Sequence, residues 1–360
     1  MRGDVYKSVR NAFVMRAIKN FRPGWLRAVP NLVAQQATSL EQVGLWPRTL
    51  VHTMRAPQTI ILRLTSHCNY RCQFCHVNEL ITDADGSDAM TVEEFRQIFS
   101  KPSLRGVLRL GITGGEPFLV GHLFELIKEA KKTIPIVTVN TNFSLVKKVL
   151  PQINESEIDM LSISLYEPNE RLIRDFSTAV KPEIYKRLSF MINEVDNFHS
   201  LKRIPEIAEM GAALGYHSVY FQNYAAYSAD LDNKTPRSEN RDANRPVREE
   251  NEEYKRLKAE TQAKLGSHIA IAWPIFARTG QPGERPRCTQ PDKQITIDRH
   301  GNLAPCCEVD ASPRYGNIHT PEGWNSEFFQ QCRKGLKVVG AELVDPCRGC
   351  SNLYQDPYTA

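Results

Sequence analysis

Short apolar runs alternate with amphipathic stretches through the middle of the chain. Each run is brief, apolar and bounded by turn-forming residues, which predicts a strand. The predicted strands are residues 59–65, 107–113, 136–140, 160–165, 188–195 and 218–222. Between the runs, apolar residues recur at helical spacing. The predicted helices are one starting after Thr91, then 123–132, 145–150, a helical region reaching about residue 187, 201–214 and 247–265.

Strands that alternate with helices favour a parallel sheet with helical crossovers. Six such units suit an α/β fold of the partial (β/α)6 TIM-like barrel type. In parallel barrels, functional residues gather at the carboxyl ends of the strands. Functional side chains are therefore expected directly after the predicted strands.

The segments on either side of this barrel have a different character. Residues 1–57 form a basic extension, in which residues 1–55 hold nine Lys and Arg against two Asp and Glu. An apolar stripe at helical spacing predicts a helix there, formed by Val5, Val9, Phe13, Val14, Ala17 and Ile18. Packing of this helix on the barrel is favoured over peripheral contact with an anionic membrane or partner. The predicted domains are therefore 1–57, 58–280 and 281–360.

The C-terminal domain is predicted to be small and rich in cysteine. A linker-like stretch at 281–286 opens it. Residues 294–298 and 303–304 flank a turn that contains Gly301, which indicates a β-hairpin. A helical tract follows around 327–336.

Composition narrows the classes of protein that need consideration. The 360 residues are 41% hydrophobic and 24% charged, and the net charge of +5 is too mild to argue for nucleic acid. No apolar run has the length of a membrane span, and no signal peptide is visible. Nine cysteines in such a chain indicate metal ligands in a reducing compartment, so we expect a cytoplasmic protein.

Three cysteines follow the first predicted strand in a C-x3-C-x2-C array. They are Cys68, Cys72 and Cys75. Zinc knuckles and two-cluster ferredoxins use other spacings. A cubane cluster takes four thiolates, so three protein ligands leave one iron open to a small molecule.

A second motif follows the second predicted strand. Gly114 and Gly115 allow close approach of the backbone and positive φ, and Glu116 adds an acceptor for an ammonium group. Gly-Gly-Glu-Pro alone is a common turn. Its place one βα unit after the cysteine loop favours a functional role.

The two motifs together resemble those of the radical S-adenosylmethionine (SAM) superfamily. The resemblance implies that Cys68, Cys72 and Cys75 bind a 4Fe–4S cluster whose open iron takes the amine and carboxylate of SAM. It implies that Gly114, Gly115 and Glu116 hold the SAM amine, that Phe74 lies near the adenine, and that Asn142 and Ser164 contact SAM. In this family, an electron from the cluster cleaves SAM to methionine and a 5′-deoxyadenosyl radical, which removes hydrogen from substrate.

Four more cysteines lie in the C-terminal domain. They are Cys288, Cys306, Cys347 and Cys350, enough to complete a cubane cluster, although a zinc site is also possible. Cys307 competes with Cys306 for one position, and the hairpin register favours Cys306. Cys332 is expected to be a buried structural cysteine. The Gly301-x4-Cys306 step resembles the SPASM/twitch extension of radical SAM enzymes, as in enzymes of the 2-deoxy-scyllo-inosamine dehydrogenase type.

The resemblance implies an oxidoreductase that draws on an external electron donor such as flavodoxin or ferredoxin. An auxiliary cluster near a substrate radical can accept the second electron, so the net result is oxidation. A small polar metabolite, such as a sugar, aminocyclitol or nucleoside, is slightly favoured over a ribosomally made peptide that is cross-linked or epimerised. A non-catalytic iron–sulfur electron-transfer protein is the alternative of a different class. Nucleic-acid modification has no basic, aromatic-interleaved patch to support it.

Overall fold

The structure is a computed structural model of the whole chain. It describes residues 22–28, 56–72, 75, 88–193, 198–223, 251–274, 276, 280, 283–284, 286–338, 340–348, 350 and 353–354. One ten-stranded sheet organises these residues, in the order β10-β9-β8-β1-β2-β3-β4-β5-β6-β7. Its strands are β1 (Thr59–Arg63), β2 (Arg109–Thr113), β3 (Ile136–Thr141), β4 (Met160–Ser164), β5 (Tyr185–Ile192), β6 (Ser218–Asn223), β7 (Ala270–Ala272), β8 (Gln294–Asp298), β9 (Asn302–Ala304) and β10 (Ser312–Asn317).

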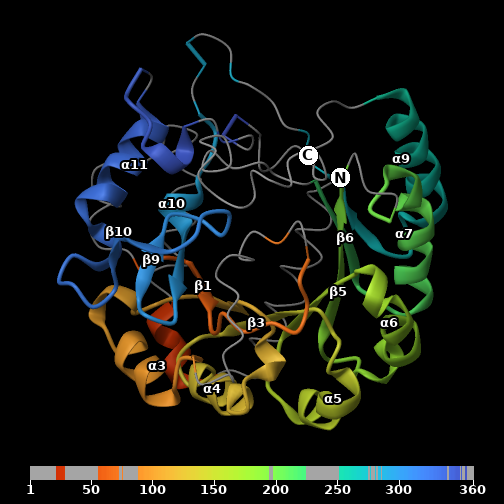
Figure 1. Cartoon of the computed structure of the whole chain (residues 1–360), viewed down its shortest axis with the longest axis horizontal. Helices are drawn as coiled ribbons and strands as arrows, with labels where there is room; N and C mark the ends of the chain where they lie inside the picture. Colours follow the sequence, from red (N-terminus) through yellow and green to blue (C-terminus); the bar gives the residue numbers. More distant parts are fainter. Residues whose placement is uncertain are drawn as a thin grey trace.

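Helices cover the outer face of the sheet in an arc (Figure 1). They are α3 (Val92–Phe99), α4 (Leu123–Ala130), α5 (Val146–Glu155), α6 (Glu170–Phe176), α7 (Ile204–Ala213) and α9 (Glu252–Leu265), with α10 (Gln290–Lys293) and α11 (Glu327–Lys337) in the C-terminal domain. Strands β1 to β7 are all parallel to their neighbours, and the sheet does not close. The predicted partial barrel is therefore confirmed. None of the described helices combines the length and the hydrophobicity that a membrane-spanning helix needs.

Alternation along the strands separates an outer, apolar face from an inner face. Side chains of a strand point to opposite faces in turn. Leu62, Ile112 and Val139 have no exposed surface and join the hydrophobic core beneath the helices. The residues between such positions line the inner face, and many of them are polar. The capping box at the start of α3 is also present, with Thr91 Oγ1 accepting from the Glu94 backbone N–H and Glu94 accepting in return.

The prediction was wrong about where the fifth strand starts. β5 begins at Tyr185, three residues before the predicted Leu188, and the preceding helical segments end by Ala179. The sequence pattern missed the first residues of β5 because Lys186 and Arg187 interrupt the apolar run. Lys186 is buried all the same, since its amine donates to the Ser177 and Leu214 carbonyls at 2.9 and 3.2 Å.

The C-terminal domain continues the barrel sheet. β8 pairs in parallel with β1, residue for residue from Thr59 with Gln294 to Arg63 with Asp298. β8 and β9 then form the predicted antiparallel hairpin, with Gly301 at φ +79° in its turn. β9, β10, α10 and α11 consequently lie beside β1 at one edge of the barrel (Figure 1). The pairing brings the carboxyl ends of β1 and β8 to the same edge of the sheet.

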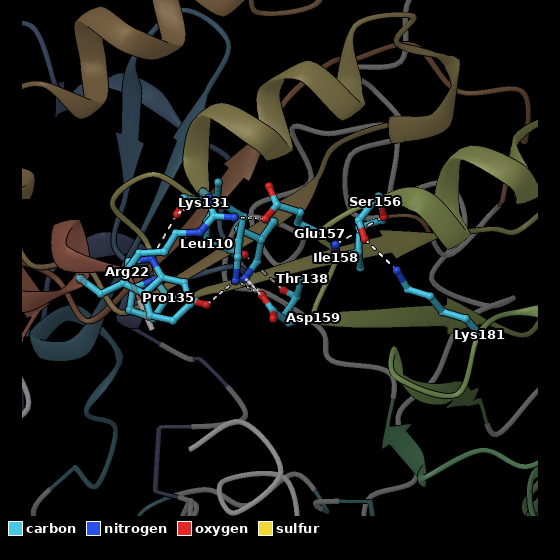
Figure 2. Close-up of polar contacts among 12 residues, drawn as sticks. Arg22, Leu110, Lys131, Pro135, Thr138, Ser156, Glu157, Ile158, Asp159 and Lys181 are labelled. Atoms are coloured by element: carbon cyan, nitrogen blue, oxygen red, sulfur yellow. Dashed lines mark hydrogen bonds and ion pairs between the residues drawn. The ribbon is translucent and has the colours of Figure 1, made fainter. Parts of the chain in front are cut away.

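The described part of the N-terminal extension packs on the barrel. In η1 (Pro23–Ala28), Trp25 is buried and its indole Nε1 donates to the Lys131 carbonyl at 3.0 Å. Figure 2 shows Arg22 beside Glu157, with which it forms an ion pair, and Lys131 bonded to the Pro135 carbonyl and to Asp159. The helix predicted at residues 5–18 and the 1–57 boundary lie outside the described residues.

Candidate cluster and cofactor site

The three N-terminal cysteines lie together on the loop that follows β1. The Cys75 N–H donates to the Cys72 carbonyl at 3.0 Å, and the Tyr70 N–H points at the Cys68 sulfur at 3.4 Å. Burial, and then the charges of Cys75 and Cys68, raise the pKa of the Cys72 thiol to about 12. Each of these thiolates disfavours the charge of the next, and a bound cation would relieve that repulsion.

The two glycines let the loop after β2 lie directly against the cysteine loop. A Cβ at Gly115 would lie 1.9 Å from the His67 carbonyl oxygen, and Gly114 has φ +135°. The N–H groups of Gly115 and Glu116 donate to the carbonyls of Thr65 and His67, each at 2.8 Å. Glycine is therefore required here for contact between two loops.

The carboxylate of Glu116 is turned into the protein. It accepts hydrogen bonds from the Asn142 N–H at 2.7 Å, the Thr141 hydroxyl at 2.8 Å and the Phe118 N–H at 3.1 Å. The side chain is 1% exposed, and burial raises its pKa to about 7. The sequence predicts an acceptor for an ammonium group. In the structure, the hydrogen bonds of Glu116 fix the turn after β3.

That turn carries Asn142 to the cysteine loop. Its side-chain amide lies 3.9 Å from the Cys68 sulfur and donates to Asn69 Oδ1 at 3.0 Å. Ser164 ends β4, and its carbonyl accepts from Asn169 at 2.8 Å. Phe74 lies outside the described residues.

Sequence reasoning missed Tyr166, which lies two residues after Ser164. Its ring meets the Tyr70 ring edge-on, with the centroids 6.2 Å apart. Burial, and next the charge of Cys72, raise the pKa of the Tyr166 phenol well above its usual range. The available signal was its place at the end of the fourth strand, where function gathers in parallel barrels.

A second group of thiols lies in the C-terminal domain. Cys288, Cys347 and Cys350 pack with Cys332 and Leu336 in one small cluster. The sulfurs of Cys332 and Cys347 are 3.7 Å apart. Cys332 is 1% exposed, as expected of a buried cysteine, but its contact with a predicted ligand was not foreseen.

The neighbouring cysteines 306 and 307 face different surroundings. Burial raises the pKa of Cys306 well above its ordinary value, and the charges of Cys307, Glu308 and Cys288 add to this in that order, whereas Cys288 has no such effect on Cys307. Cys307 points instead at Glu308, whose carboxylate accepts from its sulfur at 3.6 Å. Of the two, Cys306 lies toward the other C-terminal thiols.

Arg63 ties the barrel to this region. It is the last residue of β1 and is 5% exposed. Its guanidinium pairs with Asp310 at 2.6 Å and donates to the carbonyls of Cys307 and Val309 at 3.3 and 3.2 Å. The loop after Cys306 is therefore anchored to the strand that leads into the first cysteine loop.

Both sets of residues fit iron–sulfur clusters. All nine cysteines are free thiols. The first loop offers three thiols, which is the donor set of a cubane with one open iron, and the second region offers at least four. Backbone and amide N–H groups point at the Cys68 sulfur, as a bound thiolate requires.

Comparison with known proteins agrees with this assignment. Residues 62–220 match the radical SAM superfamily, and residues 288–351 match SPASM, an iron–sulfur cluster-binding domain. The "Probable GTP 3′,8-cyclase" of Thermococcus kodakarensis is 29% identical over 128 residues, 36% of this chain and 37% of that protein. The "PqqA peptide cyclase" of Bradyrhizobium diazoefficiens is 24% identical over 239 residues, 63% of this chain and 60% of that protein. The chain thus spans little more than a third of the length of the first of these relatives.

Solved structures support the fold. SuiB of Streptococcus suis, bound to its precursor peptide SuiA, aligns with a TM-score of 0.55 at 13% identity, covering 83% of this chain and 70% of SuiB. These domains imply three kinds of cofactor: SAM, the 4Fe–4S cluster that binds SAM, and auxiliary iron–sulfur clusters in the SPASM domain. The chain therefore contains a radical SAM domain, residues 62–220, followed by a SPASM iron–sulfur cluster-binding domain, residues 288–351.

Proposed function

We propose that this protein is an enzyme that cleaves SAM reductively and removes hydrogen from a carbon atom of its substrate. One observation carries the proposal: the Gly-Gly-Glu loop is hydrogen-bonded directly to the three-cysteine loop. The site for SAM and the site for its cluster therefore form one rigid unit. A non-catalytic electron-transfer protein has no need of this second loop.

Each residue of the unit has a task in the proposal. Cys68, Cys72 and Cys75 hold the cluster, and Asn142 donates toward the Cys68 sulfur. The Glu116 carboxylate keeps Asn142 in place by accepting a hydrogen bond from the Asn142 backbone N–H. When bound, the cluster and SAM supply a 5′-deoxyadenosyl radical, with the electron drawn from a donor such as flavodoxin or ferredoxin.

In the C-terminal domain we assign an auxiliary 4Fe–4S cluster to Cys288, Cys306, Cys347 and Cys350. The surroundings of Cys306 support it over Cys307 as the fourth ligand. Loss of a hydrogen atom, an electron and a proton from substrate amounts to a two-electron oxidation. The auxiliary cluster is an acceptor for that electron.

The first substrate class is a small polar metabolite, such as a sugar, aminocyclitol or nucleoside. The match to a probable GTP cyclase, an enzyme named for a nucleotide, supports it. The second is a ribosomally made peptide, supported by the match to a peptide cyclase, which covers more of this chain. A dependence of turnover on a leader peptide distinguishes the two.

The test is SAM cleavage by anaerobically reconstituted protein with dithionite. We expect 5′-deoxyadenosine and methionine in equal amounts from the wild type, and neither from Cys72→Ala. Wild-type protein that holds iron at the first loop yet forms no 5′-deoxyadenosine contradicts the proposal.

A further inference from the structure

One guanidinium lies on the inner face of the barrel sheet, outside the site described above. Arg187 is the third residue of β5. Its neighbour Leu188 is fully buried in the core under the helices, and Lys186 reaches carbonyls on that same outer side. Since side chains alternate along a strand, Arg187 faces inward.

The contacts of Arg187 on this face are all neutral. Its Nε and Nη2 both donate to the Ser162 hydroxyl of β4, each at 3.1 Å. Its Cζ lies 5.2 Å from the centroid of the Tyr220 ring of β6. The Ser162 oxygen is also 3.2 Å from the Ser189 hydroxyl. Within the described residues, no carboxylate forms an ion pair with Arg187.

Two other arginines of the barrel have anionic partners. Arg63 pairs with Asp310, and Arg203 pairs with Glu170 and Glu206. A charge inside a protein is costly unless it is paired, and arginine does not shed its proton to escape that cost. Desolvation lowers the pKa of Arg187, and the side chain is nonetheless partly accessible.

The geometry of the donors defines what could pair with this charge. A guanidinium has five N–H donors in a planar fork that suits a carboxylate or phosphate. Nε and Nη2 share one hydroxyl oxygen, which leaves the Nη1 side of the fork for another acceptor. We propose that Arg187, supported by Ser162 and Tyr220, binds an oxyanion of the substrate, a carboxylate or a phosphate, on the inner face of the barrel.

The position favours the substrate over SAM as the source of the anion. Arg187 pairs in register with Ser162, two residues before Ser164, the residue assigned to SAM. Two residues correspond to ~7 Å along a strand. The bonds to Ser162 hold the guanidinium on the amino-terminal side of Ser164, farther from the carboxyl ends of the strands. The assignment rests on the proposed function, because it treats this face as the substrate side of a radical SAM barrel.

The test is calorimetric titration of inorganic phosphate, and separately of acetate, into the reconstituted full-length protein at constant ionic strength. We expect at least one of the two anions to bind. The anion that binds more tightly indicates whether the substrate group is a phosphate or a carboxylate. Arg187→Met should weaken that binding at least ~10-fold, since it removes the charge-assisted hydrogen bonds to the anion. Arg187→Lys keeps the charge without the fork and should bind with intermediate affinity.

Arg171→Met is the matched control, because this arginine is 93% exposed on α6. It should bind anions as the wild type does. Anion binding that is absent in the wild type, or unchanged in both Arg187 variants, overturns the inference. If Arg187→Met does not fold, Arg187→Lys decides: affinity equal to the wild type contradicts the fork geometry.

Titration of the wild type with and without saturating SAM separates the two sources of anion. Binding that persists with SAM present supports a substrate site, and binding that SAM abolishes assigns Arg187 to the SAM carboxylate instead. Failure of the proposed function would be seen in a different measurement, the SAM-cleavage assay. Wild-type protein that binds the anion through Arg187 but forms no 5′-deoxyadenosine would keep this site and refute the radical chemistry.

Discussion

The buried carboxyl of Glu116 gives the fold a pH dependence that can be calculated. Its pKa is raised from an ordinary 4.5 to about 7 by burial. The native state therefore binds this proton more tightly than the unfolded state does. The stability it provides is fully present below pH 4.5 and is lost as the pH rises through 7. At ~1.4 kcal/mol per pKa unit, ionisation of Glu116 costs the fold about 3 kcal/mol.

Glu116→Gln removes the carboxyl group that titrates, and it also removes one hydrogen bond. The glutamine carbonyl still accepts from Thr141 and Phe118, whereas its amide meets the Asn142 N–H as a second donor, a mismatch of about 1–3 kcal/mol. The variant should be the less stable protein at pH 5. Because the wild type loses about 3 kcal/mol by pH 8, the difference should vanish or reverse there.

Urea unfolding followed by circular dichroism, on protein without SAM, measures this difference at each pH. Glu253→Gln, an exposed glutamate on α9, is the control and should follow the wild type throughout. Parallel curves for the wild type and Glu116→Gln between pH 5 and 8 would refute the account of Glu116.

Three further predictions concern the two cluster sites. Gly115→Ala should lose the iron of the first site, because its Cβ would lie 1.9 Å from a carbonyl oxygen. Gly121→Ala is the control and should keep that iron, since a Cβ there would have no atom within 4 Å. Full iron content in both variants would contradict the packing argument. Arg63→Met removes an ion pair to the half-exposed Asp310 and two bonds to carbonyls, so the free energy of unfolding in urea should fall by about 2 kcal/mol, and an unchanged value would contradict the anchoring role. Cys306→Ala should lose about four irons per chain and Cys307→Ala none, by colorimetric iron assay; the reverse result would exchange their roles.

The barrel could be predicted from the sequence because its strands are short apolar runs with clear boundaries. The same logic failed at β5, where Lys186 and Arg187 interrupt the run. Both side chains are satisfied by tertiary partners, carbonyls for Lys186 and the Ser162 hydroxyl for Arg187. A local pattern contains no information about such distant partners.

The cysteine motifs could likewise be found from spacing, but their surroundings could not. The approach of Cys332 to Cys347 depends on how α11 packs on the C-terminal loop, fifteen residues away in sequence. The parallel pairing of β8 with β1 joins residues more than 200 positions apart. The anchoring of that region by Arg63 follows from this pairing, so it became visible only in three dimensions.

The central claim is that the chain has two separate iron–sulfur sites, and one measurement tests it most directly. A variant in which Cys68, Cys72 and Cys75 are all alanine is reconstituted anaerobically, and its iron content and EPR spectrum are measured. We predict about four irons per chain and a cubane signal on reduction, held by the C-terminal cysteines. Complete loss of iron, especially with zinc in its place, would contradict the claim and leave a radical SAM enzyme with one cluster and a structural C-terminal domain.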